Sequence, residues 1–186
     1  MRVRQIIEVD ARVSSRLRVA EVPGFRRTVA MILAHSGDSW FWGAALVAIW
    51  LLSDAFWKRW AVVMLAAISV LAAVVMGLKF IIRRRRPEGD WGSIYRNSDP
   101  HSFPSGHAAR AFLIAVLATA IGPAGLAIVL WIWAPLVSLA RVAMGVHYVS
   151  DVVAGSILGA IAGLLAWQAS GPFLAWLARL IGSPLW

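Results

Sequence analysis

Residues 60–82 decide the fold: they read WAVVMLAAISVLAAVVMGLKFII and are followed directly by RRRRP at residues 83–87. An α-helix needs about 20 apolar residues to cross the hydrocarbon core of a bilayer. This run is long enough, and its only charge is Lys79, near its end. The arginines then stop the span, as basic clusters do at a membrane–water boundary. The sequence therefore predicts a transmembrane helix here.

The composition extends this prediction to the whole chain. Of 186 residues, 60% are hydrophobic and 15% are charged. A soluble domain of this size cannot bury so much apolar surface, so lipid is the expected solvent for much of it. The length fits one domain. We therefore expect residues 1–186 to form a single membrane-embedded domain.

Further apolar runs flank the first one. They cover residues 40–57, 105–122, 124–143 and 150–169. The expected fold is all-α, an integral membrane helical bundle with about five transmembrane helices. The run at 150–169 is rich in glycine and alanine, which suits close helix packing in lipid. The apolar tail at 173–180 is expected to rest on the membrane surface.

The first 24 residues have a different pattern. Apolar residues recur near helical spacing among several arginines, and Pro23-Gly24 ends the pattern. This is typical of an amphipathic helix that lies in the membrane interface. A short apolar stretch at 29–34 and a polar turn at 35–39 then precede the first predicted span.

The net charge of +9 comes almost entirely from arginine, with 16 Arg against two Lys. Guanidinium groups suit phosphate recognition and anionic lipid head groups. Because the basic residues lie beside the spans, and no nucleic-acid-binding module is present, we expect no nucleic acid partner. The chain has no cysteine, which excludes disulfides and thiolate metal sites.

Residues that could carry chemistry stand at the ends of the predicted spans. Lys79 and Arg86 end one run, Ser105, Gly106 and His107 begin the next, Arg141 ends another, and His147 and Asp151 begin the last. Charged groups at such places are costly and need a reason. Because short connections make neighbouring helices antiparallel, all these residues are expected at one end of the bundle.

Each cluster has a local logic. Lys79 and Arg86 are two helical turns apart, so both are expected on one helix face before Pro87 ends the helix. Ser105 is a candidate N-cap, and Gly106 would let a phosphate approach the free amides of the new helix.

The last cluster pairs a histidine with a carboxylate. His147 and Asp151 are four apart, so Asp151 can accept a hydrogen bond from imidazole Nδ1 and leave Nε2 as a nucleophile. Arg141 and His147 are six apart and do not share a helical face. A break near Gly145 is therefore expected if both serve one site.

These residues and their spacings resemble the three-part motif of the type 2 phosphatidic acid phosphatase family. The matching segments are Lys79-x6-Arg86-Pro87, then Pro104-Ser105-Gly106-His107, then Arg141-x5-His147-x3-Asp151. The family includes membrane lipid phosphatases, soluble acid phosphatases and vanadium haloperoxidases. In one departure, Ala140 stands where the family usually has serine, which would remove a hydroxyl from the phosphate site.

The resemblance implies a mechanism without a cofactor or metal ion. His147 would attack phosphorus and form a phosphohistidine, with Asp151 orienting it. His107 would protonate the leaving alkoxide and then activate water. The phosphoryl oxygens would be held by Lys79, Arg86, Ser105, the Gly106 amide and Arg141. The implied substrate is a lipid phosphate: phosphatidylglycerol phosphate, phosphatidic acid, a polyprenyl phosphate or pyrophosphate, or lipid A 1-phosphate.

Two other functions stay open, a vanadate-dependent haloperoxidase-like enzyme and a non-catalytic membrane scaffold or transporter. We expect a multi-pass protein of a bacterial inner (plasma) membrane. Since Lys58, Arg59 and Arg179 are the only basic residues at the opposite end, the positive-inside rule places the motif end in the cytoplasm.

The remaining polar residues receive simpler interpretations. His35 and His101 are interpreted as interfacial residues, and Arg83, Arg84 and Arg85 as a membrane anchor. Arg110 is expected to extend its guanidinium towards the head groups. The acids of the loop are expected to be solvated: Glu88, Asp90 and Asp99.

Overall fold

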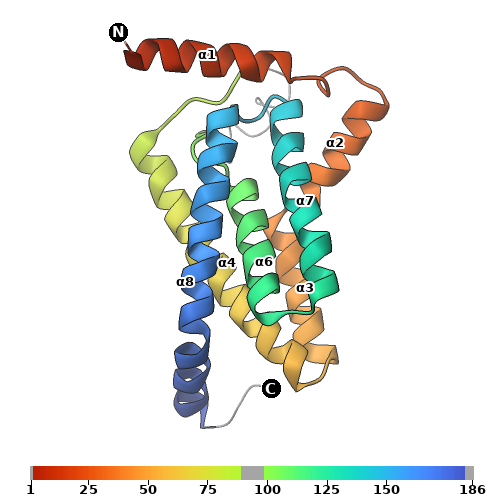
Figure 1. Cartoon of the computed structure of the whole chain (residues 1–186), viewed down its shortest axis with the longest axis vertical. Coiled ribbons are helices and arrows are strands. Elements are labelled where there is room, and N and C mark those ends of the chain that lie inside the picture. Colours follow the sequence, from red (N-terminus) through yellow and green to blue (C-terminus); the bar gives the residue numbers. More distant parts are fainter. Residues whose placement is uncertain (1, 89–98, 183–186) are drawn as a thin grey trace.

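The computed structural model describes residues 2–88 and 99–182, and its regular elements there are all helices (Figure 1). The helices are α1 (Arg2–Arg16), α2 (Phe25–His35), α3 (Ser39–Leu52), α4 (Ala55–Ile82), α6 (Gly106–Ile121), α7 (Ala124–Ala143) and α8 (Val149–Ile181). An isolated bridge joins Arg85 to His101. The prediction of an all-α bundle is confirmed.

Three helices, α4, α7 and α8, are long and apolar enough to cross a membrane, and α3 and α6 are shorter apolar helices. They run along the long axis of the molecule (Figure 1). Large apolar side chains stay exposed on their outer faces, among them Val70, Ile132 and Ile161. Such surfaces are stable against lipid tails and not against water. The five predicted spans therefore correspond to α3, α4, α6, α7 and α8.

The first predicted span, residues 40–57, has the wrong end. Helix α3 stops at Leu52, and Asp54 is the N-cap of α4. Its Oδ1 accepts hydrogen bonds from the amides of Phe56 at 3.0 Å and Trp57 at 3.2 Å. A capping carboxylate bonds amides that have no partner within their own helix, and so it favours the start of a new helix. The hydropathy of residues 40–57 did not reveal this boundary, because the apolar run continues on both sides of Asp54.

Helices α2 and α3 follow each other down one side of the bundle, with the polar turn at residues 36–38 between them (Figure 1). The short apolar stretch at 29–34 is thus part of α2. Together the two helices run along the length of the bundle, with the turn as an interruption between them.

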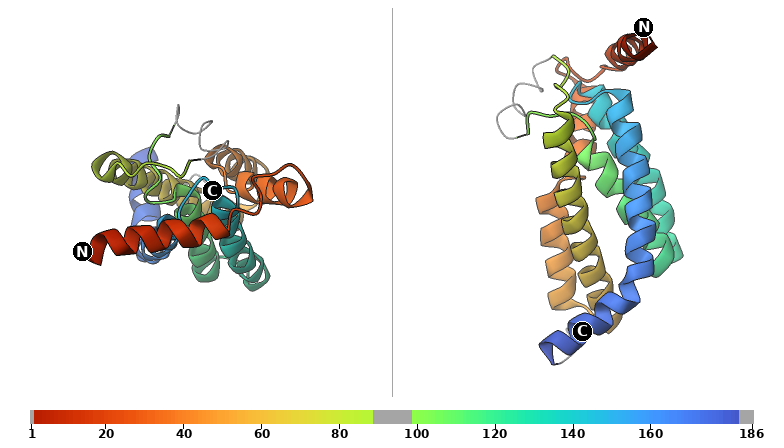
Figure 2. Two further views of the ribbon diagram at one scale, coloured as in Figure 1. Left: turned by 90° about the horizontal axis from the view of Figure 1, so that it is seen from above. Right: turned by 90° about the vertical axis from the view of Figure 1, so that its left-hand side faces the viewer.

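Helix α8 also differs from the prediction. It continues from Val149 through Pro172 to Ile181, so the predicted surface tail is the last part of this helix. In the right-hand view of Figure 2, that last part turns away from the rest of α8. Proline lacks the amide that would bond the preceding turn, and this accounts for the change of direction.

Helices α6 and α8 pack closely along a row of glycines. A Cβ added at Gly155 would overlap the carbonyl of Ser105, and one at Gly159 would overlap the carbonyl of Ala109. At Gly163 it would come within 2.8 Å of Val116 Cβ. The close packing expected for this run is confirmed, since only glycine lets the two backbones approach this far.

Helix α1 lies across one end of the bundle (Figures 1 and 2). Ser14 Oγ accepts a hydrogen bond from the amide of Val149 at 2.9 Å, and the Ala20 amide donates to the carbonyl of Ala143 at 3.1 Å. These contacts fasten the N-terminal segment to the end of α7 and the start of α8.

Candidate active site

The predicted site residues gather at the end of the bundle that α1 covers. Helix α6 begins below the ends of α7 and α8 (Figure 1), so residues at its start lie inside the bundle rather than at its surface. The side chains of Lys79, Arg86, Ser105, Arg141, His147 and Asp151 are all buried. The expectation that these clusters meet at one end is confirmed in position.

The connection from α7 to α8 contains the predicted break. Helix α7 ends at Ala143, and Gly145 adopts a φ of +69°, a left-handed conformation that glycine takes without strain. The Val146 amide donates to the carbonyl of Arg141 at 3.2 Å and closes the turn. The chain reverses there, which brings His147 back beside Arg141.

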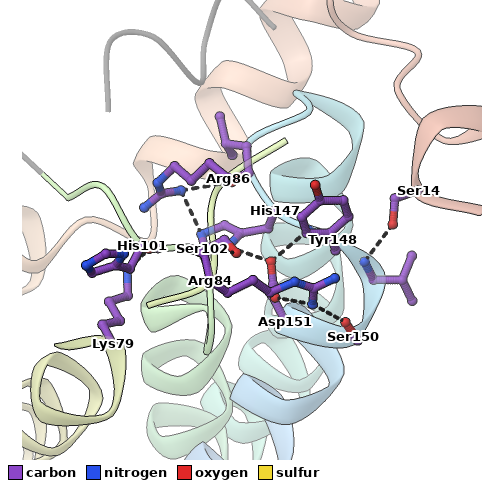
Figure 3. Close-up of polar contacts among 12 residues, drawn as sticks. Ser14, Lys79, Arg84, Arg86, His101, Ser102, His147, Tyr148, Ser150 and Asp151 are labelled. Carbon is purple, nitrogen blue, oxygen red and sulfur yellow. Dashed lines mark hydrogen bonds and ion pairs between the residues drawn. The ribbon is translucent and has the colours of Figure 1, made fainter. Parts of the chain in front are cut away.

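His147 and Asp151 are neighbours, as their spacing predicts. His147 Nδ1 lies 3.5 Å from Asp151 Oδ2, and both side chains are inaccessible to solvent (Figure 3). The same Oδ2 accepts a hydrogen bond from the Tyr148 amide at 2.8 Å. Since the Nδ1 contact is long and does not meet hydrogen-bond geometry, the pair is aligned but not yet tightly bonded.

The other imidazole nitrogen faces a guanidinium. Arg86 Nη1 lies 3.3 Å from His147 Nε2 and donates to the Val146 carbonyl at 2.8 Å. An arginine nitrogen can only donate, so this contact requires a lone pair on Nε2. Burial, together with the charges of Arg86, Arg141 and Lys79, lowers the pKa of His147 well below its usual range. His147 is therefore neutral at neutral pH.

Lys79 and Arg86 meet by a route that the sequence did not predict. Helix α4 ends at Ile82, and Arg83 takes a left-handed conformation with φ of 51°, so Arg86 does not lie on the helix. Instead, Lys79 Nζ and Arg86 Nη2 both contact Asp99 Oδ2, the arginine at 2.7 Å. The prediction that Asp99 is solvated is wrong, because two cations hold it.

Ser105, at the start of α6, has a buried hydroxyl that makes no capping bond. Ser105 is the N-cap residue of α6, as predicted, but its hydroxyl has no hydrogen-bond partner in the described part of the chain. The Ser105 amide donates to the Asp151 carbonyl at 2.9 Å. A buried hydroxyl without a partner is uncommon, and it is available to an anion.

A cavity of about 150 Å³ lies against His107. Its polar lining consists of Ser39, Lys79, Asp99, Gly106, His107 and Arg110. The rest is apolar and comes from α4: Ile68, Leu71, Ala72, Val75 and Met76. The site thus combines cations and a histidine with a hydrocarbon wall.

Arg141 is fully buried, and its charge acts on His107, His147 and Lys79. Ala140, the departure from the family motif, packs in an apolar cluster with Ala30, Ala34 and others. Its side chain does not line the cavity. A hydroxyl at this position would therefore meet apolar neighbours.

Arg83 and Arg85 are exposed, and their interpretation as membrane anchors stays a prediction, whereas Arg84 is part of the site. Arg84 Nη1 donates to Asp151 Oδ1 at 2.8 Å (Figure 3), and its Nη2 donates to Asp10 Oδ2 at 2.6 Å. Ser150 also donates its amide to Asp10, at 3.1 Å. No sequence signal separates Arg84 from its neighbours, because the distinction arises only where the chain leaves α4.

The interpretations of Arg110 and His101 also need revision. Arg110 does not reach the head groups: it is buried and donates to the Gly37 carbonyl at 2.8 Å. His101 is partly buried, and its carbonyl accepts a hydrogen bond from Lys79 at 3.1 Å. His35 is half exposed, in keeping with an interfacial residue. Glu88 is exposed as expected, and Asp90 lies outside the described residues.

Paired histidines, a buried carboxylate and clustered cations inside an all-helical membrane bundle define a membrane-embedded phosphatase. The chain belongs to the PAP2 superfamily, whose profile matches residues 60–174. It is 30% identical to a probable lipid phosphate phosphatase beta of Arabidopsis thaliana, over 87% of this chain and 88% of the relative. It is 34% identical to a decaprenylphosphoryl-5-phosphoribose phosphatase of Mycobacterium tuberculosis, over 88% of this chain and 91% of the relative.

Two solved structures share the fold. A transmembrane PAP2-type phosphatidylglycerolphosphate phosphatase of Bacillus subtilis superposes with a TM-score of 0.73 at 22% identity, over 90% of this chain and 87% of that one. Aquifex aeolicus LpxE superposes with a TM-score of 0.67 at 23% identity, over 84% of this chain and 93% of that one. The chain is thus a multi-pass membrane protein of the PAP2 lipid phosphatase type.

Proposed function

We propose that this phosphatase hydrolyses a phosphate ester on a lipid with a long hydrocarbon chain. The observation that carries the proposal is the mixed lining of the cavity beside His107. Its cations suit a phosphate, and the α4 wall suits the alkyl segment next to it. A small polar ester has no alkyl segment that could contact the apolar α4 lining.

A second, larger hollow supports the same conclusion. It measures about 440 Å³, and its lining from α4, α6 and α8 is almost entirely apolar. Leu71 lines both this hollow and the cavity beside His107. A lipid whose phosphate lies near His107 could therefore place its hydrocarbon chain along α4 without crossing a polar surface.

In the first step, His147 Nε2 attacks phosphorus and displaces the lipid alkoxide. The lone pair needed for attack is present on the neutral imidazole, and Asp151 stabilises the positive charge that develops on the ring. His107 gives a proton to the leaving oxygen. Arg86, now 3.3 Å from Nε2, is placed to hold a phosphoryl oxygen instead.

In the second step, water attacks the phosphohistidine and His107 takes a proton from that water. Charge on the transferring phosphoryl group is neutralised by Lys79, Arg86 and Arg141, with the Ser105 hydroxyl and Gly106 amide as further donors. Three cations supply the positive charge that a metal ion supplies in other phosphatases. We therefore expect activity to persist in EDTA.

Among lipid phosphates, we place polyprenyl-linked phosphates first. The Mycobacterium tuberculosis relative is named for a decaprenyl-linked substrate and matches nearly the whole chain. A Sulfolobus acidocaldarius relative, 35% identical over 56% of this chain and 54% of its own length, is named an undecaprenyl-diphosphatase. Phosphatidylglycerol phosphate, phosphatidic acid and lipid A 1-phosphate are the other candidates. The inner membrane of a bacterium is the proposed location.

Phosphate release from a panel of these lipids in mixed micelles tests the proposal, with EDTA present throughout and vanadate as the inhibitor. We expect release from at least one polyprenyl-linked phosphate, and inhibition by vanadate. The His147→Ala variant should lose turnover and still bind inorganic phosphate. No release from any lipid, or a His147→Ala variant near wild-type activity, would overturn the proposal; halide oxidation with vanadate and peroxide would point to a haloperoxidase instead.

A further inference from the structure

The polar turn between α2 and α3 lies inside the bundle, against the start of α6. Irregular backbone at membrane depth is tolerated only where protein buries it or where it lines a cavity. A Cβ added at Gly37 would lie 2.9 Å from Val137 Cγ1 and 3.3 Å from His107 Cδ2. The turn therefore packs directly on α7 and on the ring of His107.

Asp38, in this turn, contacts His107 with one oxygen and other groups with the second. Its Oδ1 lies 2.7 Å from His107 Nε2. Its Oδ2 lies 3.0 Å from His35 Nδ1 and accepts from Trp40 Nε1 at 3.2 Å. A carboxylate that accepts from several donors is held in its ionised form and in one orientation.

Arg110 holds the turn in place from α6, one helical turn beyond His107. Its Nε donates to the Gly37 carbonyl at 2.8 Å, and its Nη1 donates to Ser39 Oγ at 2.5 Å. From α7, Trp133 Nε1 donates to Ser36 Oγ at 2.8 Å. Asp38 thus has little freedom to move away from His107.

We propose that Asp38 is a positioning residue that holds the Nε2–H of His107 and thereby directs its Nδ1 towards the transferring phosphoryl group. The inference rests on the proposed function, in which His107 is the acid and base. Because Nε2 is engaged with Asp38, Nδ1 is the ring nitrogen left for the cavity that His107 lines.

The proton balance follows from this assignment. In the first step, the proton on Nδ1 moves to the leaving oxygen, which keeps the electron pair of the broken P–O bond. In the second step, Nδ1 takes a proton from the attacking water, and the P–N bond electrons return to His147. The Nε2–H bond to Asp38 stays intact throughout, and Asp38 stays ionised.

The surrounding charges explain why a carboxylate is needed. Arg141 and Arg110 both act on His107, and both oppose a positive imidazole. Lys79 also lines the cavity. The negative charge of Asp38, in direct contact with the ring, opposes the effect of these cations and so favours the protonated ring that delivers the proton.

The test compares two leaving groups in the Asp38→Asn variant. An alkoxide leaves poorly without a proton, whereas p-nitrophenolate leaves well without one. General acid catalysis contributes about 10²–10⁴-fold, and kcat/KM reports only the steps up to departure of the leaving group. Loss of this positioning should therefore lower kcat/KM for a lipid monophosphate by about 10–100-fold. On p-nitrophenyl phosphate we expect a loss of about threefold or less, because its leaving group scarcely needs the proton.

The matched control is Trp40→Phe, which removes a donor to Oδ2 and keeps the contact of Oδ1 with His107. It should leave kcat/KM unchanged on both substrates. An equal loss on both substrates in Asp38→Asn would show a merely structural role and overturn the inference, as would no loss on either. Wild-type protein inactive on both substrates would instead refute the proposed function itself.

A measurement on the unaltered protein covers the case in which Asp38→Asn does not fold. The nitrogen-15 shifts of His107, assigned by comparison with a His107→Asn variant, report which ring nitrogen carries the proton. We expect a protonated Nε2. A neutral ring protonated only on Nδ1 would contradict the inference.

Discussion

Replacing Arg84 with alanine should impair catalysis, whereas the same change at Arg83 should not. The two arginines are adjacent in a run of four and equivalent as membrane anchors. Arg84 links the buried Asp151 to Asp10. The exposed side chain of Arg83, within the described part of the chain, donates to the carbonyl of Phe80 at 2.8 Å. Comparing the Arg84→Ala and Arg83→Ala variants therefore distinguishes a role in the active site from a role as a membrane anchor.

The size of the effect follows from the contacts. A hydrogen bond to a charged group contributes about 1.5–3 kcal/mol, and breaking a fully buried ion pair costs about 3–5 kcal/mol. Because the Arg84 side chain is 22% exposed and Asp151 is 0% exposed, water can replace part of the lost interaction. We therefore expect about 2 kcal/mol, which corresponds to roughly a 30-fold lower kcat if Asp151 loses its alignment with His147.

The assay is initial-rate phosphate release from a lipid monophosphate in micelles, with thermal unfolding in the same detergent measured in parallel. Arg84→Lys keeps the charge but lacks the two separate nitrogens that donate to Asp151 and Asp10, so its kcat should lie between those of the wild type and Arg84→Ala. Equal kcat for Arg84→Ala and Arg83→Ala would refute the reasoning, and so would a loss that thermal unfolding of the sample fully explains.

Four further predictions concern other parts of the site and fold. As the pH falls below 6.5, kcat/KM should stay at its plateau value, because burial and nearby cations lower the pKa of His147 and its neutral form is the one that attacks. Arg86→Gln removes one of those charges, so the decrease of kcat/KM on the acidic side should move to higher pH. Asp99→Asn should strengthen vanadate inhibition about three- to tenfold, roughly 0.6–1.4 kcal/mol, because Lys79 and Arg86 lose a competing carboxylate; an unchanged inhibition constant would argue against it. Gly159→Ala should cost about 1–3 kcal/mol of stability through overlap with Ala109, whereas Gly171→Ala, with open space around it, should not lower the Tm. On intact cells, an impermeant thiol reagent should label Ala55→Cys and spare Glu88→Cys if the motif end is cytoplasmic, and the reverse pattern would place the site outside.

The sequence predicted the features that depend on hydropathy and on short spacings. The apolar pattern predicted a helix over residues 124–143, and these are the bounds of α7. The six-residue separation of Arg141 and His147 predicted the break that the structure has at Gly145. These patterns are local, so one chain segment contains all the information that they need.

What the sequence did not predict depends on contacts between distant segments. Asp99 and Arg84 looked like solvated or anchoring residues, because nothing near them in the chain shows which partner they meet. Asp38 appeared only as part of a polar turn, although it contacts a residue 69 positions away. The register of Arg86 was also wrong, since a left-handed Arg83 ends α4 before Pro87 could.

The glycine row between α6 and α8 has a consequence for how this scaffold can diverge. It fixes the distance between the helix that carries His107 and the helix that carries Asp151, so neither can shift to accommodate a different lipid. The apolar wall of the cavity belongs to α4, outside that row. Substitutions at Ile68, Ala72 or Met76 can therefore change which hydrocarbon chain fits the cavity without moving the catalytic residues. The range of lipid substrates can then evolve faster than the reaction itself.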